Sequence, residues 1–190
     1  NRIFINNQGN YNVAYYEILR EGSISGVFLT IGTLTSAENS FLDDNSNNTS
    51  VSYKYKVRLI DSCGNVFTNN SLHKTILLQS SVSVNNSVNL SWTHYEGITY
   101  PTYSIYRKVN QGDYQMLDQV ASSNNSYNDQ SANVLTNNYE YYIAISIDSC
   151  NNNSLKNQKN NQTQIKSNRQ NIGSGSFINE QILSSQITLY

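Results

Sequence analysis

The sequence predicts an all-β protein built from two tandem β-sandwich domains, and three observations lead to this fold class. The chain repeats itself at a spacing of about 87 residues, because Tyr-Glu-Ile-Leu-Arg at 16–20 returns as Tyr-Ser-Ile-Tyr-Arg at 103–107 and Ile-Asp-Ser-Cys at 60–63 returns at 147–150. Tyr, Thr, Val and Ile, which favour strands, are abundant, and Asn and Ser supply turns. Apolar and polar residues also alternate in short runs, which is the pattern of a half-buried strand.

Each copy of the repeat is long enough to bury a core of its own, because domains of roughly 90 residues can fold alone. We therefore expect domain 1 over residues 1–79, domain 2 over residues 80–172, and an extended tail over residues 173–190. Domain 1 is expected to lack its first strand, since no sequence for one precedes the Ile3-x-Ile5 run. No Pro- or Gly-rich linker separates the copies, so residues 73–84 predict one nearly continuous extended segment across the boundary.

The second copy shows its strands most clearly. A hairpin is expected where Val82 and Val84 precede an Asn-Asn turn and alternation resumes at Val88, Leu90 and Trp92. A seventh strand is expected within residues 162–172. The other residues expected to face inward are Tyr103 and Ile105 of the third strand, Tyr114, Met116 and Val120 of the fourth, Tyr127 of the fifth, and Tyr139, Tyr141, Ile143, Ile145 and Ile147 of the sixth.

Seven short strands, a Trp on the second and a Tyr-x-Tyr-x-aliphatic run on the sixth resemble a fibronectin type III domain, which is an immunoglobulin-like β-sandwich. The resemblance implies that Trp92 fills the centre of domain 2 and that Tyr139 anchors the corner before the sixth strand. In domain 1 Tyr53 matches that corner, whereas Ile5 stands in the place of the Trp. The structural core expected from both copies comprises Trp92, Tyr53, Tyr139, Tyr16 and Tyr103.

Phrases such as Ser-Tyr-Lys-Tyr-Lys-Val at 52–57 and Val-Asn-Leu-Ser-Trp at 88–92 resemble paired fibronectin-like repeats near the carboxyl end of secreted Bacteroidetes proteins. Such proteins commonly leave the cell by the type IX secretion system, and Gln-Ile-Thr-Leu-Tyr at 186–190 resembles the strand that opens its sorting domain. The resemblance implies a secreted or cell-surface module that follows upstream domains of the same protein and is recognised by the type IX export machinery. Nothing at Asn1 has the pattern of a signal peptide, so the chain is expected to begin inside a longer protein.

The tail contains too many apolar residues for a pure linker and too few for a core. We expect it to form one or two strands that pair with a sheet edge or another chain, because their backbone groups need partners. The residues concerned are Phe177, Ile178, Ile182, Leu183, Ile187 and Leu189.

Charge and motif content argue against several classes of function. The formal net charge is −1, which provides no attraction for nucleic acid or an anionic membrane, and no window approaches the roughly 20 apolar residues of a membrane helix. No nucleophile–base–acid set or phosphate loop can be assembled, so we expect no enzyme activity and no cofactor. Cys63 and Cys150 occupy equivalent repeat positions, too far apart for a disulfide, and are expected to be free, half-buried thiols.

Three surface features remain as candidate sites. The Asp-Asp-Asn-Ser-Asn-Asn run at 43–48 has alternating oxygen ligands, but it lacks the Gly and Glu of a calcium loop and is interpreted as a hydrated turn without metal. Lys54, Lys56 and Arg58 form a basic stripe with Glu17 expected across from it. Tyr106 and Tyr142 are expected to form an exposed cross-strand pair, which either binds a surface glycan or protein ligand or stiffens the sheet.

The sequence therefore favours a non-catalytic spacer that presents an upstream domain at the cell surface. The alternative is an adhesin or a carbohydrate- or protein-binding module that uses the exposed face of domain 2.

Overall fold

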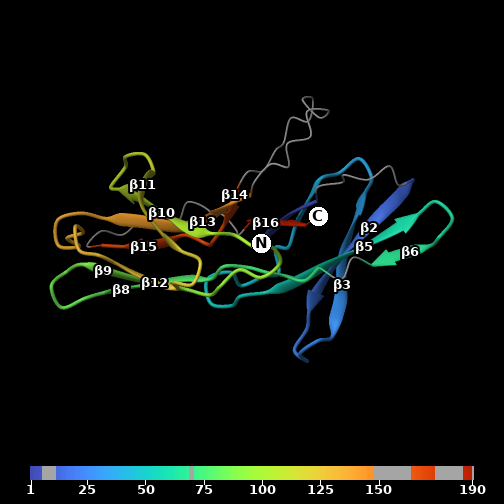
Figure 1. Ribbon diagram of the computed structural model, residues 1–190, viewed down its shortest axis with the longest axis horizontal. Helices are drawn as coiled ribbons and strands as arrows, with labels where there is room; N and C mark the ends of the chain where they lie inside the picture. The colour runs from blue at the N-terminus through green and yellow to red at the C-terminus, as the bar shows by residue number, and fades with distance from the viewer. Residues whose placement is uncertain (6–11, 69–70, 148–163, 174–185, 190) are drawn as a thin grey trace.

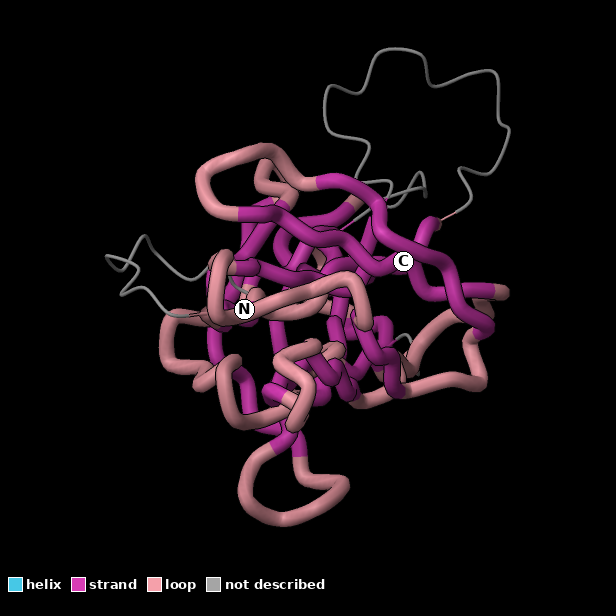
Figure 2. Tube along the Cα trace, turned by 90° about the vertical axis from the view of Figure 1, so that its left-hand side faces the viewer, coloured by secondary structure: helices cyan, strands magenta, loops and turns pink. Residues whose placement is uncertain are grey.

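The computed structural model describes residues 1–5, 12–68, 71–147, 164–173 and 186–189, and this part of the chain contains strands and no helix (Figures 1 and 2). Two immunoglobulin-like sandwiches lie end to end along the long axis, which confirms the predicted fold class (Figure 1). The strands of the first are β1 (Arg2–Ile5), β2 (Val13–Glu21), β3 (Phe28–Thr35), β4 (Ser40–Leu42), β5 (Lys54–Asp61), β6 (Val66–Thr68) and β7 (His73–Lys74).

The strands of the second sandwich come next in the chain. They are β8 (Leu78–Val82), β9 (Val88–Trp92), β10 (Thr102–Val109), β11 (Gln115–Ala121), β12 (Ser126–Asp129), β13 (Tyr139–Ser146), β14 (Gln164–Lys166) and β15 (Gln170–Ile172). The expected seventh strand is thus divided in two.

Sheet topology repeats with the sequence. The order β3-β2-β5 in domain 1, with β6 and β7 both pairing β5, returns in domain 2 as β11-β10-β13, with β14 and β15 both pairing β13. Facing these sheets are β1 paired with β4 in domain 1 and β8-β9-β12 in domain 2. The duplication read from the sequence is therefore a duplication of topology.

A last strand, β16 (Gln186–Leu189), joins the sheets of the two domains. It pairs in parallel with β1 over all four residues and touches β14 at a single antiparallel pair, Lys166 with Gln186. Beside β1 it takes the place that β8 takes beside β9. The expectation that the tail pairs with a sheet edge is confirmed for these residues. Phe177, Ile178, Ile182 and Leu183 lie outside the described residues.

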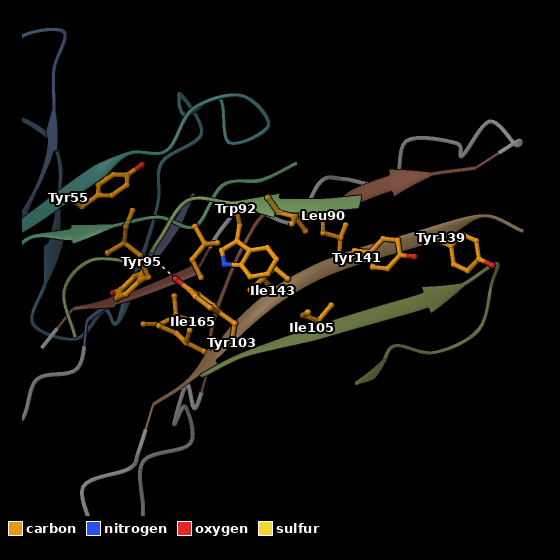
Figure 3. Close-up of a cluster of buried hydrophobic side chains, with 14 of the residues drawn as sticks. Tyr55, Leu90, Trp92, Tyr95, Tyr103, Ile105, Tyr139, Tyr141, Ile143 and Ile165 are labelled. Carbon is orange, nitrogen blue, oxygen red and sulfur yellow. Dashed lines mark hydrogen bonds between the residues drawn. The ribbon is translucent and has the colours of Figure 1, made fainter. Parts of the chain in front are cut away.

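The core of domain 2 lies between its two sheets (Figure 3). Trp92 from β9 packs edge-on against Tyr103 from β10, with their ring centroids 5.4 Å apart. The expected inward face of the sixth strand is confirmed, because Tyr139, Tyr141 and Ile143 are all buried. Burial of Tyr16 and of Tyr103, and the packing of the half-buried Tyr53 against the core, agree with the rest of the expected core.

Four expected inward positions of domain 2 are wrong. Val82 and Val84 are exposed: β8 is buried at Leu78 but accessible at Val82, its last residue, and Val84 lies in the turn that follows. Met116 is exposed because a register shift in the pairing of β10 with β11, between Ile105 and Tyr106, changes which residues of β11 face inward. Tyr114 lies on the outer face, where it contacts Tyr142, as described below.

Candidate functional site

Tyr106 and Tyr142 form the cross-strand pair that the sequence predicts. They are opposite each other in the register of β10 and β13, and their rings stack with centroids 4.7 Å apart and planes inclined by 8°. Two aromatic residues at paired positions of antiparallel strands place their rings on the same face of the sheet. The pair therefore lies on the outer face, opposite the side on which Ile105 and Ile143 are buried.

The expected exposure of this pair is wrong for Tyr142, of which 9% is accessible. Tyr106 covers one side of the ring, Tyr114 meets it edge-on at 4.8 Å, and the Lys166 ammonium lies 5.2 Å from its centroid. Burial raises the pKa of the Tyr142 hydroxyl, and burial likewise lowers the pKa of Lys166. Tyr106 remains half-exposed and is the more accessible ring of the pair.

Charged side chains continue this outer face beside the rings. Glu140 forms ion pairs with Lys108 at 3.6 Å and with Arg169 at 3.4 Å, and the Arg169 guanidinium lies 5.1 Å from the ring centroid of Tyr114. Burial, and then the nearby Glu140 carboxylate, raise the pKa of the Tyr114 hydroxyl. Stacked rings and ion pairs thus follow one another across this face, an arrangement that stiffens a sheet, and Tyr106 remains half-exposed within it.

The matching face of domain 1 carries charge instead of rings. Leu19 pairs with Lys56, and Glu17 pairs with Arg58, where the guanidinium and carboxylate are 2.6 Å apart. Lys54 contacts Glu21 at 3.5 Å. The basic stripe expected on β5 is confirmed, and its Lys54 and Arg58 have acidic partners. The third cation, Lys56, has its ammonium 4.4 Å from the centroid of the Phe28 ring.

A polar network inside domain 1 was not expected from the sequence. The buried Asp43 accepts from Arg20 at 2.7 and 2.9 Å and from the Tyr55 hydroxyl at 2.7 Å. The Arg20 guanidinium lies 5.1 Å over the ring of Tyr53, whose hydroxyl accepts from the backbone N–H of Asn47. The first carboxylate of the candidate calcium loop is therefore held inside the sandwich by a cation and a phenol. Among the described residues, no group of three or more His, Cys, Asp or Glu side chains could hold a metal ion.

Domain 2 repeats this network residue for residue. Asp129 accepts from Arg107 at 2.7 Å and from the Tyr141 hydroxyl at 2.8 Å. Arg107 lies 5.6 Å from the ring of Tyr139, whose hydroxyl accepts from the backbone N–H of Asn133. Both copies of the repeat contain the Arg, the Asp and the Tyr-x-Tyr run that form the network. These residues are well separated within each copy, so the sequence alone did not indicate that they are in contact.

The junction between the domains is the second region of interest. β7 pairs with β5 of domain 1 and β8 pairs with β9 of domain 2, and residues 75–77 between them are all buried. The N–H of Thr75 donates to Tyr53 in domain 1, and the carbonyl of Leu77 accepts from Thr93 in domain 2. The expected segment across the boundary is therefore present as two strands, residues 73–74 and 78–82, joined by three buried residues, and it ends before Val84, which lies in a turn.

The loop after β9 contacts the same segment from domain 2. The N–H of Lys74 donates to the carbonyl of Glu96 at 3.0 Å, and the two side chains are paired at 3.2 Å. The Thr93 hydroxyl accepts from the N–H of Leu77 at 2.9 Å. Both domains therefore form hydrogen bonds with the junction segment.

Cys63 is a free thiol, as expected, but it is exposed rather than half-buried. It lies in the turn after β5, where its N–H donates to the Asp61 carboxylate at 2.9 Å. Cys150 lies outside the described residues. Within the described part of the chain, no helix is long and apolar enough to span a membrane.

Comparison of the sequence with models of known protein families and with curated proteins finds no match.

Proposed function

We propose that this chain is a non-catalytic, rigid spacer whose two sandwiches hold a fixed relative orientation. The observation that supports it is the shared segment at the junction, which leaves the sheet of one domain and enters the sheet of the other through three buried residues. A spacer transmits orientation only when its domains do not pivot, and interdomain motion is the default unless the interface is extensive. The buried junction restricts that motion.

The cellular setting belongs to the same proposal and is supported by the sequence resemblance alone. We propose that the spacer lies outside a bacterial cell, presents an upstream domain of the same protein, and leads into a type IX sorting signal recognised by the export machinery. The Asn- and Ser-rich, weakly charged composition suits a hydrated extracellular surface.

Small-angle X-ray scattering tests the rigid spacer. The wild-type profile should fit a single interdomain arrangement, whereas a matched variant with a Gly-Ser-Gly-Ser insertion after Ile76 should require a broad ensemble. A wild-type profile that itself required a broad ensemble would contradict the proposal.

The second candidate function is that of an adhesin or a carbohydrate- or protein-binding module, and the stacked Tyr106–Tyr142 pair is the observation that favours it. Because Tyr142 is enclosed, Tyr106 would make the contact. A glycan array with the wild type and with Tyr106→Ala tests it, and Tyr15→Ala removes an exposed tyrosine of domain 1 as the control. Binding that is absent, or equal in all three proteins, removes this candidate.

A further inference from the structure

His73 is a buried titratable group at the domain junction that the spacer function does not by itself require. It lies on β7 opposite Tyr55 of β5, and 2% of its side chain is accessible. Its ring nitrogen Nδ1 lies 2.6 Å from the Tyr95 hydroxyl, which comes from the loop between β9 and β10 of domain 2. One side chain of domain 1 thereby bonds directly to one of domain 2.

The imidazole fills its site completely on the side of domain 2. Gly97 has a φ of +130°, and a Cβ placed there would be 2.4 Å from Nδ1 of His73. Position 97 therefore requires glycine for two reasons: the positive φ of its backbone and the close approach of the His73 imidazole. The His73 and Tyr95 rings also contact each other, with centroids 5.9 Å apart.

The groups around His73 offer little compensation for a positive charge. The flanking titratable residues are Tyr55 and Lys54 on β5, Lys74 on β7, and Tyr95 and Glu96 in the loop of domain 2. Glu96, the carboxylate among them, is already paired with Lys74. Burial accordingly lowers the pKa of His73 from its ordinary 6.5 to about 4.

We propose that the junction is a proton-sensitive lock, in which neutral His73 holds the loop of domain 2 against domain 1 and protonation of His73 releases it. This inference rests on the proposed rigid spacer and adds a condition under which the rigidity is lost. In the open junction the imidazole reaches water and can carry its charge, whereas in the closed junction it cannot.

The direction and size of the effect follow from linkage. The open form binds more protons than the closed form between about pH 6.5 and about pH 4, so the closed junction is weakened as the pH falls through that window. Relative to pH 7, the ratio of open to closed forms should rise about 23-fold at pH 5 and about 120-fold at pH 4. Below about pH 4 the ratio of open to closed forms should level off, because both forms are then protonated at His73.

Interdomain distance measurements test the lock. The full chain carries Cys150→Ser, and a label pair is placed on the exposed native Cys63 of domain 1 and on Met116→Cys of domain 2, both exposed. The distance distribution should be narrow at pH 7 and should broaden between pH 6.5 and 4, while circular dichroism shows both domains still folded. The His73→Gln variant, which cannot be protonated, should stay narrow over this range, and His94→Gln at the exposed histidine should behave as the wild type.

Each other outcome has a definite meaning. A wild-type distribution that stays narrow at every pH overturns the lock and leaves the rigid spacer intact, whereas one that is broad already at pH 7 contradicts the spacer itself. Broadening that coincides with loss of strand signal, or that is equal in His73→Gln, also overturns the lock.

A second variant keeps the test decisive if His73→Gln fails to fold. Gly97→Ala places a methyl group against the imidazole and should open the junction at pH 7, giving a broad distribution with little further change in acid. Gly26→Ala is its matched control, because Gly26 also has a positive φ of 82° but meets no atom within 4 Å. A narrow distribution for Gly97→Ala at pH 7 would show that the ring does not hold the junction closed.

Discussion

The side-chain amide of Asn168 pairs with both backbone groups of Leu78, 90 residues away in the chain. Its Oδ1 accepts from the N–H of Leu78 at 2.7 Å, and its Nδ2 donates to the carbonyl of Leu78 at 3.0 Å. Asn168 interrupts the last strand of domain 2 between β14 and β15, and it is completely buried. The Asn168 side-chain amide thus makes the two hydrogen bonds that a neighbouring strand would make with Leu78, and it connects the two sheets at the start of β8.

Replacing Asn168 by Ala should destabilise domain 2 by about 2–4 kcal/mol, because two buried backbone groups would lose their partners. Urea unfolding followed by tryptophan fluorescence reports on domain 2, which contains the one Trp of the chain. Asn171→Ala, at an exposed position of β15, is the control and should change the free energy of unfolding by less than about 0.5 kcal/mol. Equal stability of both variants would mean that water replaces the amide.

Trp92→Ala should cost domain 2 about 3–5 kcal/mol, the range for emptying a large aromatic site in a packed core. Trp92 is buried against Tyr103 between the two sheets, and domain 1 should hardly be affected. Hydrogen exchange by mass spectrometry separates the domains, and protection should fall in residues 80–147 and persist in residues 54–61. Unchanged protection throughout would contradict the central packing of this residue.

The repeated Arg–Asp–Tyr networks predict matched effects in the two domains. Asp43→Ala and Asp129→Ala should each destabilise their own domain by about 3–5 kcal/mol, because each removes the carboxylate that accepts from a partly buried guanidinium and a buried phenol. The exposed Asp44→Ala and Asp113→Ala are the controls and should be nearly neutral. Thermal unfolding of all four variants provides the comparison, and a network variant as stable as its control would show that the ion pair contributes nothing.

The stabilisation from Asp129 should depend on pH in acid. Burial would raise the pKa of Asp129, but hydrogen bonds from Ser131, Arg107 and Tyr141 outweigh it and hold the pKa below the ordinary 3.8. A carboxylate with a lowered folded pKa contributes stability that is complete above the unfolded pKa and is lost as the pH falls through the folded one. The free-energy difference between the wild type and Asp129→Asn should therefore be constant above about pH 5 and shrink below about pH 4. A difference that grew in acid would reverse the assigned sign.

The proposed export route predicts the behaviour of a fusion. The tail from Gly173 onward, together with the sorting signal that the proposal places after it, should carry a foreign periplasmic protein fused to it to the surface of a type IX-competent cell. Surface labelling measures the outcome, with an established sorting domain as the positive control. Retention in the periplasm while the control is exported would remove the sorting assignment.

The fold class was predictable because each repeat carries its own local signals. Alternation along β9, β10 and β13 assigns Leu90, Ile105 and Ile143 to the core, and the structure buries all three. The close junction was also predictable, since no Pro- or Gly-rich linker separates the two repeats and the apolar run at residues 76–78 has to be covered. Errors arose after β8, where Val84 lies exposed in a turn, and at β11, where a register shift exposes Met116.

The candidate sites were predictable only as separate residues. Pairing of Tyr106 with Tyr142 follows from strand alternation once the third and sixth strands are neighbours, but the enclosure of Tyr142 depends on Tyr114 and Lys166 from other elements. Sequence by itself determined the duplication, because two stretches of the chain can be compared directly, and it determined most of the strands and the aliphatic core, because these depend on period and composition within about ten residues. Only the tertiary structure decided that Asp43 meets Arg20, that His73 meets Tyr95 and that Asn168 meets Leu78, because such polar contacts depend on the packing of segments distant in the chain, which leaves no local pattern.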